Sequence, residues 1–220
     1  MRTNYAAHDI PFTQKKAAGW PGWNSAQETW DCVQTLSGLL DQVEVASTAV
    51  VCEVGCGAGN LTETLIDRGW TVTGVDVSEV AIAWARERCR ERPVTFLQGD
   101  ICERDLFTAE TFDLIIDGLC LHCIVGQDRR QVISNLQFWL KPGGSIVVFT
   151  MCGEPKGKER ADYDPDSRCA ISGGIAVRYF AEADEIINEF SNESLRCTFQ
   201  HMVDPAGEQA SLRAVFQKPG

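Results

Sequence analysis

The sequence has 220 residues, enough to bury the core of one α/β domain, and we expect a single domain over residues 1–220. Its 31 acidic and 20 basic residues give a formal net charge of -11, which would repel a phosphate backbone. We therefore expect no nucleic acid partner.

Membrane association is not expected from the apolar pattern of the chain. Residues 1–20 contain no apolar run typical of a signal peptide, and no apolar stretch approaches the ~20 residues of a membrane-spanning helix. Several of the ten cysteines lie inside apolar, strand-like runs, where a reduced thiol behaves as a small hydrophobic group. The sequence predicts a cytoplasmic protein without a membrane partner, and it does not indicate the oligomeric state.

Residues 1–49 are interpreted as an N-terminal flap with an irregular, aromatic first part and a helix near Ala26–Val43. The tryptophans at 20, 23 and 30 have two readings that the sequence leaves open. They are core residues of the flap, or their faces close over a cationic or flat ligand.

From Val50 onward, β-rich runs alternate with helical patterns. Leu61 and Leu65, Ile82 and Ala85, and Val132 with Leu136 mark three helices between the runs. This order predicts a doubly wound, mostly parallel α/β fold with a seven-stranded sheet and helices on both faces. The predicted parallel strands are Val50–Gly55, Thr71–Ser78, Val94–Asp100, Phe112–Gly118 and Ser145–Cys152.

The last third of the chain breaks this alternation. Gly153–Gly174 is polar and rich in Gly, Pro and charge, and we expect it to be a long functional loop over the site of the 50–220 core. A helix is predicted over Phe180–Phe190. The runs Leu195–Met202 and Ser211–Gln217, joined by a turn sequence, predict an antiparallel hairpin at a sheet edge.

The first predicted strand ends in the glycine-rich sequence Gly55-Cys-Gly57-Ala-Gly59. Glycines let a ligand approach the backbone, and the following helix start favours an anionic group. The next strand ends at Asp76, whose carboxylate is suited to accept ribose hydroxyl protons. Glu53 would be unfavourable beside a pyrophosphate but suits a ligand with an amine and a sulfonium.

Five motifs in order resemble those of the class I, seven-stranded S-adenosylmethionine-dependent methyltransferases. The resemblance covers nearly the whole span from Val50 to Gln217. The matching segments are Glu53-Val-Gly-Cys-Gly-Ala-Gly59, Gly74-Val-Asp76-Val-Ser78, Gln98-Gly-Asp100-Ile101, Phe112-Asp113-Leu-Ile-Ile-Asp117-Gly118 and Leu140-Lys-Pro-Gly-Gly144.

The resemblance implies S-adenosylmethionine as the cofactor and S-adenosylhomocysteine as the product. It places Gly55 and Gly57 at the methionine end, Asp76 on the ribose, and Asp100 with Ile101 at the adenine. Asp117 would lie beneath the sulfonium. The expected cofactor-binding residues are Glu53, Gly55, Cys56, Gly57, Asp76, Val77, Asp100, Ile101, Asp117 and Gly118.

A small-molecule acceptor is expected. The chain lacks the Pro-Pro-aromatic signature of the family's branches that methylate nucleic acid amines, which argues against such amines and leaves the methylated atom open (O, N, S, C or As). It has Asp117-Gly-Leu-Cys-Leu-His122-Cys123 instead. Two alternatives remain open at this stage. One is a non-catalytic cofactor-binding sensor or partner subunit, and the other is a nicotinamide-dependent oxidoreductase, which the Gly-x-Gly-x-Gly spacing disfavours.

His122 follows the fourth strand, where open α/β sheets bind ligands, and is either a catalytic base or a structural histidine. Asp113 and Asp117 are expected to orient it or to raise its pKa. The thiols of Cys120, Cys123, Cys152 and Cys169 could converge on a soft metal or a thiol-reactive substrate. Buried, inert thiols are the competing reading, and no metal ligand set is assigned.

Overall fold

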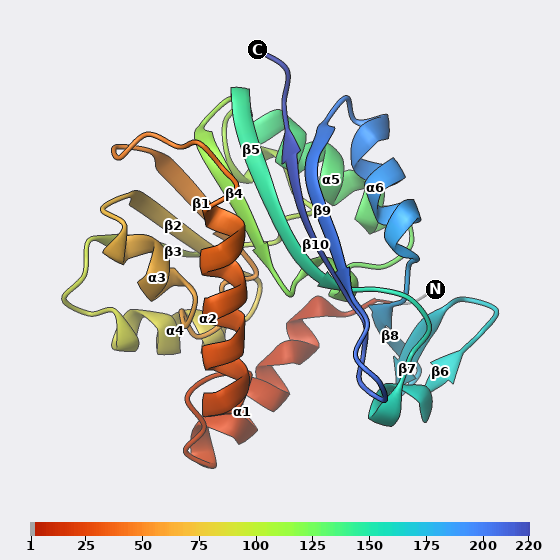
Figure 1. The fold of residues 1–220 in the computed structure, drawn as a ribbon. Coiled ribbons are helices and arrows are strands. Elements are labelled where there is room, and N and C mark those ends of the chain that lie inside the picture. The colour runs from red at the N-terminus through yellow and green to blue at the C-terminus, as the bar shows by residue number, and fades with distance from the viewer. Residues whose placement is uncertain (1–2) are drawn as a thin grey trace.

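A seven-stranded sheet forms the centre of the computed structural model, which describes residues 3–220 (Figure 1). The strand order is β3-β2-β1-β4-β5-β10-β9, with β1 to β5 parallel and β10 antiparallel to both neighbours. This confirms the predicted sheet and its C-terminal hairpin. The strands are β1 Val50–Val54, β2 Thr71–Asp76, β3 Val94–Gln98, β4 Phe112–Gly118, β5 Leu140–Met151, β9 Arg196–Val203 and β10 Ser211–Gln217.

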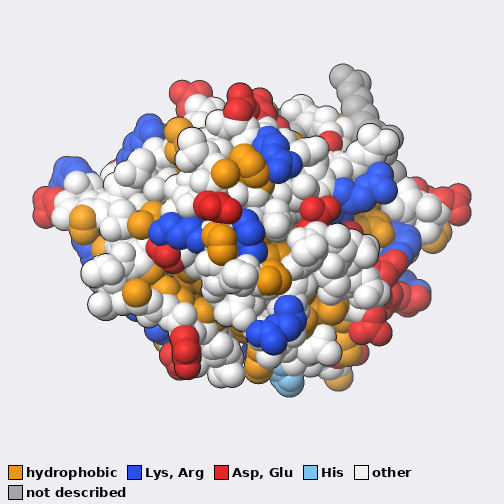
Figure 2. All heavy atoms as spheres, turned by 90° about the horizontal axis from the view of Figure 1, so that it is seen from above, with side chains coloured by type: hydrophobic (Ala, Val, Ile, Leu, Met, Phe, Trp, Pro, Cys, Tyr) orange, Lys and Arg blue, Asp and Glu red, His pale blue; other side chains and the backbone are white. Residues whose placement is uncertain are grey.

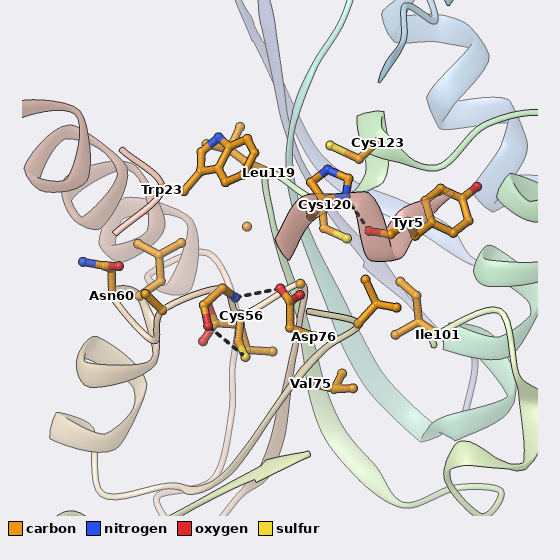
Figure 3. Close-up of a pocket in the computed structure, with 18 of the residues that line it drawn as sticks. Tyr5, Trp23, Cys56, Asn60, Val75, Asp76, Ile101, Leu119, Cys120 and Cys123 are labelled. Carbon is orange, nitrogen blue, oxygen red and sulfur yellow. Dashed lines mark hydrogen bonds between the residues drawn. The ribbon is translucent and has the colours of Figure 1, made fainter. Parts of the chain in front are cut away.

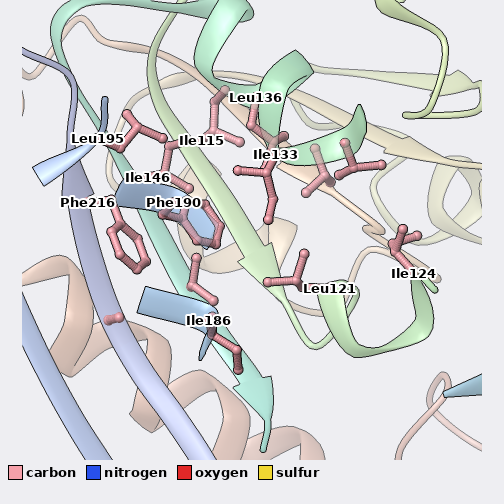
Figure 4. Close-up of a cluster of buried hydrophobic side chains, with 14 of the residues drawn as sticks. Ile115, Leu121, Ile124, Ile133, Leu136, Ile146, Ile186, Phe190, Leu195 and Phe216 are labelled. Atoms are coloured by element: carbon pink, nitrogen blue, oxygen red, sulfur yellow. The ribbon is translucent and has the colours of Figure 1, made fainter. Parts of the chain in front are cut away.

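Helices cover both faces of the sheet, as predicted. On one face α2, α3 and α4 bury an apolar cluster that includes Leu36, Leu65 and Ile82. On the other face α5 and α6 pack on a cluster with Ile133 and Phe190 (Figure 4). The helices are α1 Asp9–Ala17, α2 Ala26–Leu40, α3 Thr62–Asp67, α4 Glu79–Arg88, α5 Gln127–Trp139 and α6 Ala183–Asn192.

The carboxyl ends of the central strands meet at one edge of the sheet. Val54 at the end of β1 is in register with Val75 of β2 and with Asp117 of β4. Asp76 is in register with Gln98 at the end of β3. The segments that follow these strands therefore lie side by side, which brings the predicted motifs together although they are far apart in the chain.

Residues 5–17 are helical, so the prediction of an irregular first part was wrong there, whereas Trp20-Pro-Gly-Trp23 lies in non-helical turns and bends. A 3-10 turn over Tyr5–His8 leads into α1. Pro11 does not break α1, because it lies in the first turn, where the missing N–H has no helical partner. The Asp9 carboxylate accepts hydrogen bonds from the Ser78 hydroxyl and the Val80 N–H, which ties α1 to the start of α4.

The segment 153–174, predicted to be a loop, contains two strands that were not expected, and a third strand follows it. β6 Tyr163–Asp164, β7 Cys169–Ser172 and β8 Ile175–Tyr179 form a separate antiparallel sheet. This small sheet lies beside the N-terminal segment, at the lower edge of the molecule in Figure 1. This polar segment forms strands because some of its side chains pack against the rest of the protein. Cys169 and Ala176 are buried in one apolar cluster with Val125.

The surface carries both signs of charge. Figure 2 shows Lys and Arg side chains interspersed with Asp and Glu side chains over the face seen from above. No helix within residues 3–220 is both long enough and apolar enough to cross a bilayer.

Candidate cofactor and acceptor site

A cavity opens at the carboxyl ends of β1, β2 and β4, between the glycine-rich loop, the N-terminal segment and the turn after β4 (Figure 3). Nearly all of the site residues predicted from sequence line it. These are Glu53, Gly55, Cys56, Gly57, Asp76, Val77, Asp100, Ile101, Gly118 and His122.

Glu53 is a buried carboxylic acid on the floor of the cavity. Its side chain is 2% exposed and accepts a short hydrogen bond from the Thr62 hydroxyl. Burial raises its pKa to about 8, because the charged form loses its solvation. A cationic group beside Glu53 would favour the ionised form, so this position suits a positively charged ligand atom.

Asp76 ends β2 and faces the glycine-rich loop. Its Oδ2 accepts a hydrogen bond of 2.9 Å from the Gly57 N–H, and its Oδ1 accepts one of 2.9 Å from the Ser78 N–H. Burial raises the pKa of Asp76, and these two backbone bonds lower it. Each carboxylate oxygen accepts more than one proton, so both oxygens keep acceptor capacity for ligand hydroxyls.

The glycines of the loop are required by both backbone conformation and space. Gly55 and Gly57 have φ values of +66° and +53°. A Cβ on Gly55 would lie 2.4 Å from the Cβ of Cys120, and one on Gly57 would lie 3.3 Å from the Phe12 ring. Side chains would therefore fill the space where the loop faces the cavity.

Aromatic side chains of the N-terminal segment form the roof of this cavity. Tyr5, His8, Phe12 and Trp23 all line it, and the Phe12 and Trp23 rings meet edge to face at 5.0 Å. Sequence reasoning missed the first three, although their spacing of three and four residues is helical. Of the three flap tryptophans, Trp23 faces the cavity, whereas Trp20 and Trp30 are 39% and 59% exposed and are not core residues.

A second cavity adjoins the first and shares part of its wall. Tyr5, His8, Trp23, Cys123 and Arg178 line both cavities. The remaining walls of the second cavity come from the N-terminal segment and from the small β6-β7-β8 sheet. The segment 153–174, which was predicted to be a loop over the site, therefore lies beside the site. It contains two strands and the connections between them.

His122 lies in the cavity wall, but its pKa is shifted in the direction opposite to the one expected. Burial, together with the positive charges of Arg178 and Arg129, lowers its pKa to about 3. Its Nδ1 lies 3.3 Å from the Thr150 hydroxyl. The expectation that Asp113 would raise this pKa was wrong, since Asp113 is at the opposite end of β4 and pairs with Lys141. His122 is neutral over the physiological pH range.

Asp117 lies behind the cavity wall rather than in it. Its Oδ1 accepts hydrogen bonds from the N–H groups of Cys120 at 3.1 Å and Leu121 at 2.8 Å. Burial raises its pKa to about 7, against the lowering effect of these bonds and of Arg129. The expectation that Asp117 also raises the pKa of His122 was wrong, because the pKa of that imidazole is lowered.

The four thiols considered from sequence do not form one cluster. Cys120 and Cys123 line the cavity, whereas Cys152 and Cys169 are buried in two different apolar clusters. Among the residues that the structure describes, no group of three or more His, Cys, Asp or Glu side chains could hold a metal ion. Burial raises the pKa of Cys120 well above its usual value, so that thiol is protonated.

The sheet order and the position of the cavity define the class of α/β proteins that bind ligands at the carboxyl ends of parallel strands. Comparison with known proteins identifies the family. The methyltransferase domain family matches residues 51–144. A methyltransferase of Geobacillus sp. is 31% identical over 164 residues, which are 73% of this chain and 76% of that protein. The chain belongs to the class I S-adenosylmethionine-dependent methyltransferase family.

Other relatives agree with this family. A methyltransferase of Mycobacterium bovis is 32% identical over 123 residues, which are 56% of this chain and 61% of the relative. The match therefore spans about three fifths of that relative's length. The crystal structure of a Burkholderia thailandensis 1,6-didemethyltoxoflavin-N1-methyltransferase superimposes with a TM-score of 0.72 at 19% identity, covering 98% of this chain and 88% of that one. That structure contains bound 1,6-didemethyltoxoflavin and S-adenosylhomocysteine.

Proposed function

We propose that this chain binds S-adenosylmethionine and transfers its methyl group to a small-molecule acceptor. The observation that carries the proposal is the pair of adjoining cavities, one lined by acids at the strand ends and the other by the flap and the small sheet. In this proposal the first cavity holds the cofactor and the second admits the acceptor. The shared wall is the place where the two meet.

The residues of the first cavity fit the parts of this cofactor. Asp76 accepts the ribose hydroxyl protons, and Asp100 with Ile101 contacts the adenine. Gly55 and Gly57 leave room for the methionine end, while the Glu53 carboxylate balances its positive charge. Cys56, Val77 and Gly118 complete the walls.

The sulfonium supplies an activated methyl group when the cofactor is bound, so this chain's residues have mainly to align the acceptor and exclude water. Tyr5, Phe12 and Trp23 cover the cavity from the flap side. We propose His122 as the site residue for the acceptor. As a neutral imidazole it holds the acceptor by a hydrogen bond, and its low pKa makes it a weak base.

S-adenosylmethionine and S-adenosylhomocysteine should each raise the melting temperature, whereas NAD should not. At 100 times the dissociation constant, a ligand stabilises the folded state by about 2.7 kcal/mol. In a chain of this size that corresponds to about 5–10 °C. Differential scanning fluorimetry measures the shift. Stabilisation by NAD alone would support the oxidoreductase alternative.

Release of S-adenosylhomocysteine in a screen of small-molecule acceptors tests transfer itself. A protein that binds the cofactor tightly but methylates nothing in a broad screen would be the sensor or partner subunit considered from sequence. The screen should include nitrogen, oxygen, sulfur and carbon nucleophiles, because the shared wall does not select one of them.

Cofactor affinity should depend on pH through Glu53. Its pKa of about 8 means that the carboxyl is mostly protonated at pH 6, and binding next to a cationic amine requires it to lose that proton. Affinity for S-adenosylhomocysteine should therefore rise up to about tenfold per pH unit from pH 6 towards pH 8 and then level off. Titration calorimetry in buffers of different ionisation enthalpy measures the released proton. Glu53→Gln should bind more weakly and lose the proton release, and an unchanged pH profile in that variant would contradict the assignment.

A further inference from the structure

The turn between β4 and α5 forms the wall of the cavity that faces the glycine-rich loop. Gly118, Leu119, Cys120, His122, Cys123 and Ile124 all line the cavity. Leu119 has a φ of +70°, which is unfavourable for a residue with a branched side chain. Such a backbone persists only where neighbouring groups hold it, so the surroundings of this turn determine the shape of the wall.

The N–H side of the turn is held by Asp117. Its Oδ1 accepts from both Cys120 and Leu121, and the carboxyl group is 2% exposed. The Leu121 side chain points into the apolar cluster between β4, α5 and α6 (Figure 4). Leu121, the residue before His122, is thereby held at its amide N–H and at its side chain.

The backbone carbonyl of Leu121 is held by Arg129 of α5. Arg129 Nη1 donates to the Leu121 carbonyl at 2.8 Å. Its Nε donates to both carboxylate oxygens of Glu189 of α6, at 2.7 and 2.8 Å. The guanidinium is 3% exposed, so one buried cation connects the turn to a second helix.

This arrangement is poorly suited to stabilising the fold. Burying a carboxylate and a guanidinium costs solvation energy, and apolar residues of similar size commonly do as well. Asp117 Oδ2 and Arg129 Nη2 are buried and make no hydrogen bond to the described residues, which adds to that cost. The charged groups instead fix the orientation of the backbone. Asp117 holds the Leu121 N–H, and Arg129 holds the Leu121 carbonyl.

We propose that Asp117, Arg129 and Glu189 are positioning residues, which hold the two peptide groups on either side of Leu121 so that the neighbouring His122 faces the acceptor. The proposal rests on the proposed function. These three residues act through the turn and do not touch the cofactor or the acceptor themselves. Their loss should therefore impair transfer much more than it impairs cofactor affinity.

A second ion pair in the same region provides a matched control. Arg168 donates to both carboxylate oxygens of Glu185, at 2.8 and 2.6 Å, and Glu185 is on the same helix as Glu189. Both arginines also lie over Tyr179, at 5.3 Å for Arg168 and 5.4 Å for Arg129. Arg168 donates to the Phe180 carbonyl and not to the turn after β4.

The test compares Arg129→Met and Glu189→Gln with Arg168→Met and Glu185→Gln in the full chain. Hydrogen exchange of the peptide covering residues 118–125 should be at least tenfold faster in Arg129→Met and faster to a smaller extent in Glu189→Gln. In the control variants it should be unchanged. With an acceptor from the screen, kcat should fall about 10- to 100-fold in Arg129→Met while the dissociation constant of S-adenosylhomocysteine changes less than twofold.

Arg129→Lys keeps the charge but cannot bond Glu189 and the Leu121 carbonyl with the same geometry, so only partial recovery of kcat is expected. Unchanged exchange of the turn, equal effects in the Arg168 variants, or wild-type kcat in Arg129→Met would each overturn the proposal. If Arg129→Met does not fold, Glu189→Gln, which keeps the shape of the side chain, decides the question. If the wild-type chain methylates no acceptor, the proposed function fails. The hydrogen-exchange data still test whether Arg129 and Glu189 hold the turn after β4.

Discussion

Gly55→Ala should reduce affinity for S-adenosylhomocysteine at least 100-fold. The new Cβ would lie 2.4 Å from the Cβ and 2.6 Å from the Sγ of Cys120, a separation at which the loop or the turn after β4 must move. The positive φ of +66° adds about 1–2 kcal/mol of backbone strain. Titration calorimetry and thermal unfolding measure the two effects separately.

Gly69→Ala is the matched control for the backbone strain caused by a positive φ. Gly69 has a φ of +81°, and a Cβ there would have no neighbouring atom within 4 Å. It should lower stability by the strain alone and leave affinity unchanged. The double variant Gly55→Ala/Cys120→Gly removes the atoms that clash and should recover part of the affinity. Equal binding by Gly55→Ala and the wild-type chain would place the cofactor away from this loop.

Asp76→Ala should weaken binding of S-adenosylhomocysteine by about 1–3 kcal/mol, or about 5- to 150-fold, because charge-assisted hydrogen bonds to the ribose are lost. The same change removes the acceptor for the Gly57 N–H, so the glycine-rich loop loses a support as well. Calorimetry measures the affinity.

Asp113→Asn is the comparison for Asp76, since Asp113 is an aspartate of the same sheet at the opposite end of β4 and pairs with Lys141. It should bind the cofactor as tightly as the wild-type chain, within about twofold. If both variants bind alike, the ribose is not held by Asp76.

The central sheet was predictable because its signals are local and repeated. Each parallel strand contains a short apolar run, and the motif residues Gly55, Asp76 and Asp100 lie at the ends of their strands or within two residues of them. Once the order of the strands is known, residues at their carboxyl ends must share one edge. The cavity could therefore be expected from spacing alone.

The missed elements depend on contacts between distant segments. α1 contains Pro11, which reads as a helix breaker unless the start of the helix is known. β7 and β8 are interrupted by Gly173 and Gly174 and form a sheet only with each other and with β6. Neither feature has a periodic pattern strong enough to outweigh its turn-forming residues.

The chemistry of the site was also only partly predictable. The sequence placed His122 at the right strand end, but the sign of its pKa shift depends on burial and on two arginines that are distant in sequence, Arg129 and Arg178. Likewise, the partners of Asp117, Cys120 and Leu121, are close in the chain, but the burial of Asp117 and the nearby charge of Arg129 are not visible there. Charge effects of this kind require the three-dimensional neighbours.

The walls of the second cavity come from parts of the chain that lie outside the seven-stranded sheet. The flap supplies Tyr5 and His8, and the β6-β7-β8 sheet supplies Ala170, Ala176 and Arg178. Except for Tyr5, these positions lie outside the two apolar clusters on the faces of the seven-stranded sheet, so substitutions at them need not disturb that core. In evolutionary terms the two halves of the site can diverge at different rates. If the second cavity takes the acceptor, as proposed, a lineage can exchange one acceptor for another through a few substitutions in the N-terminal segment and the small sheet, while the glycine-rich loop and its acids keep the same methyl donor.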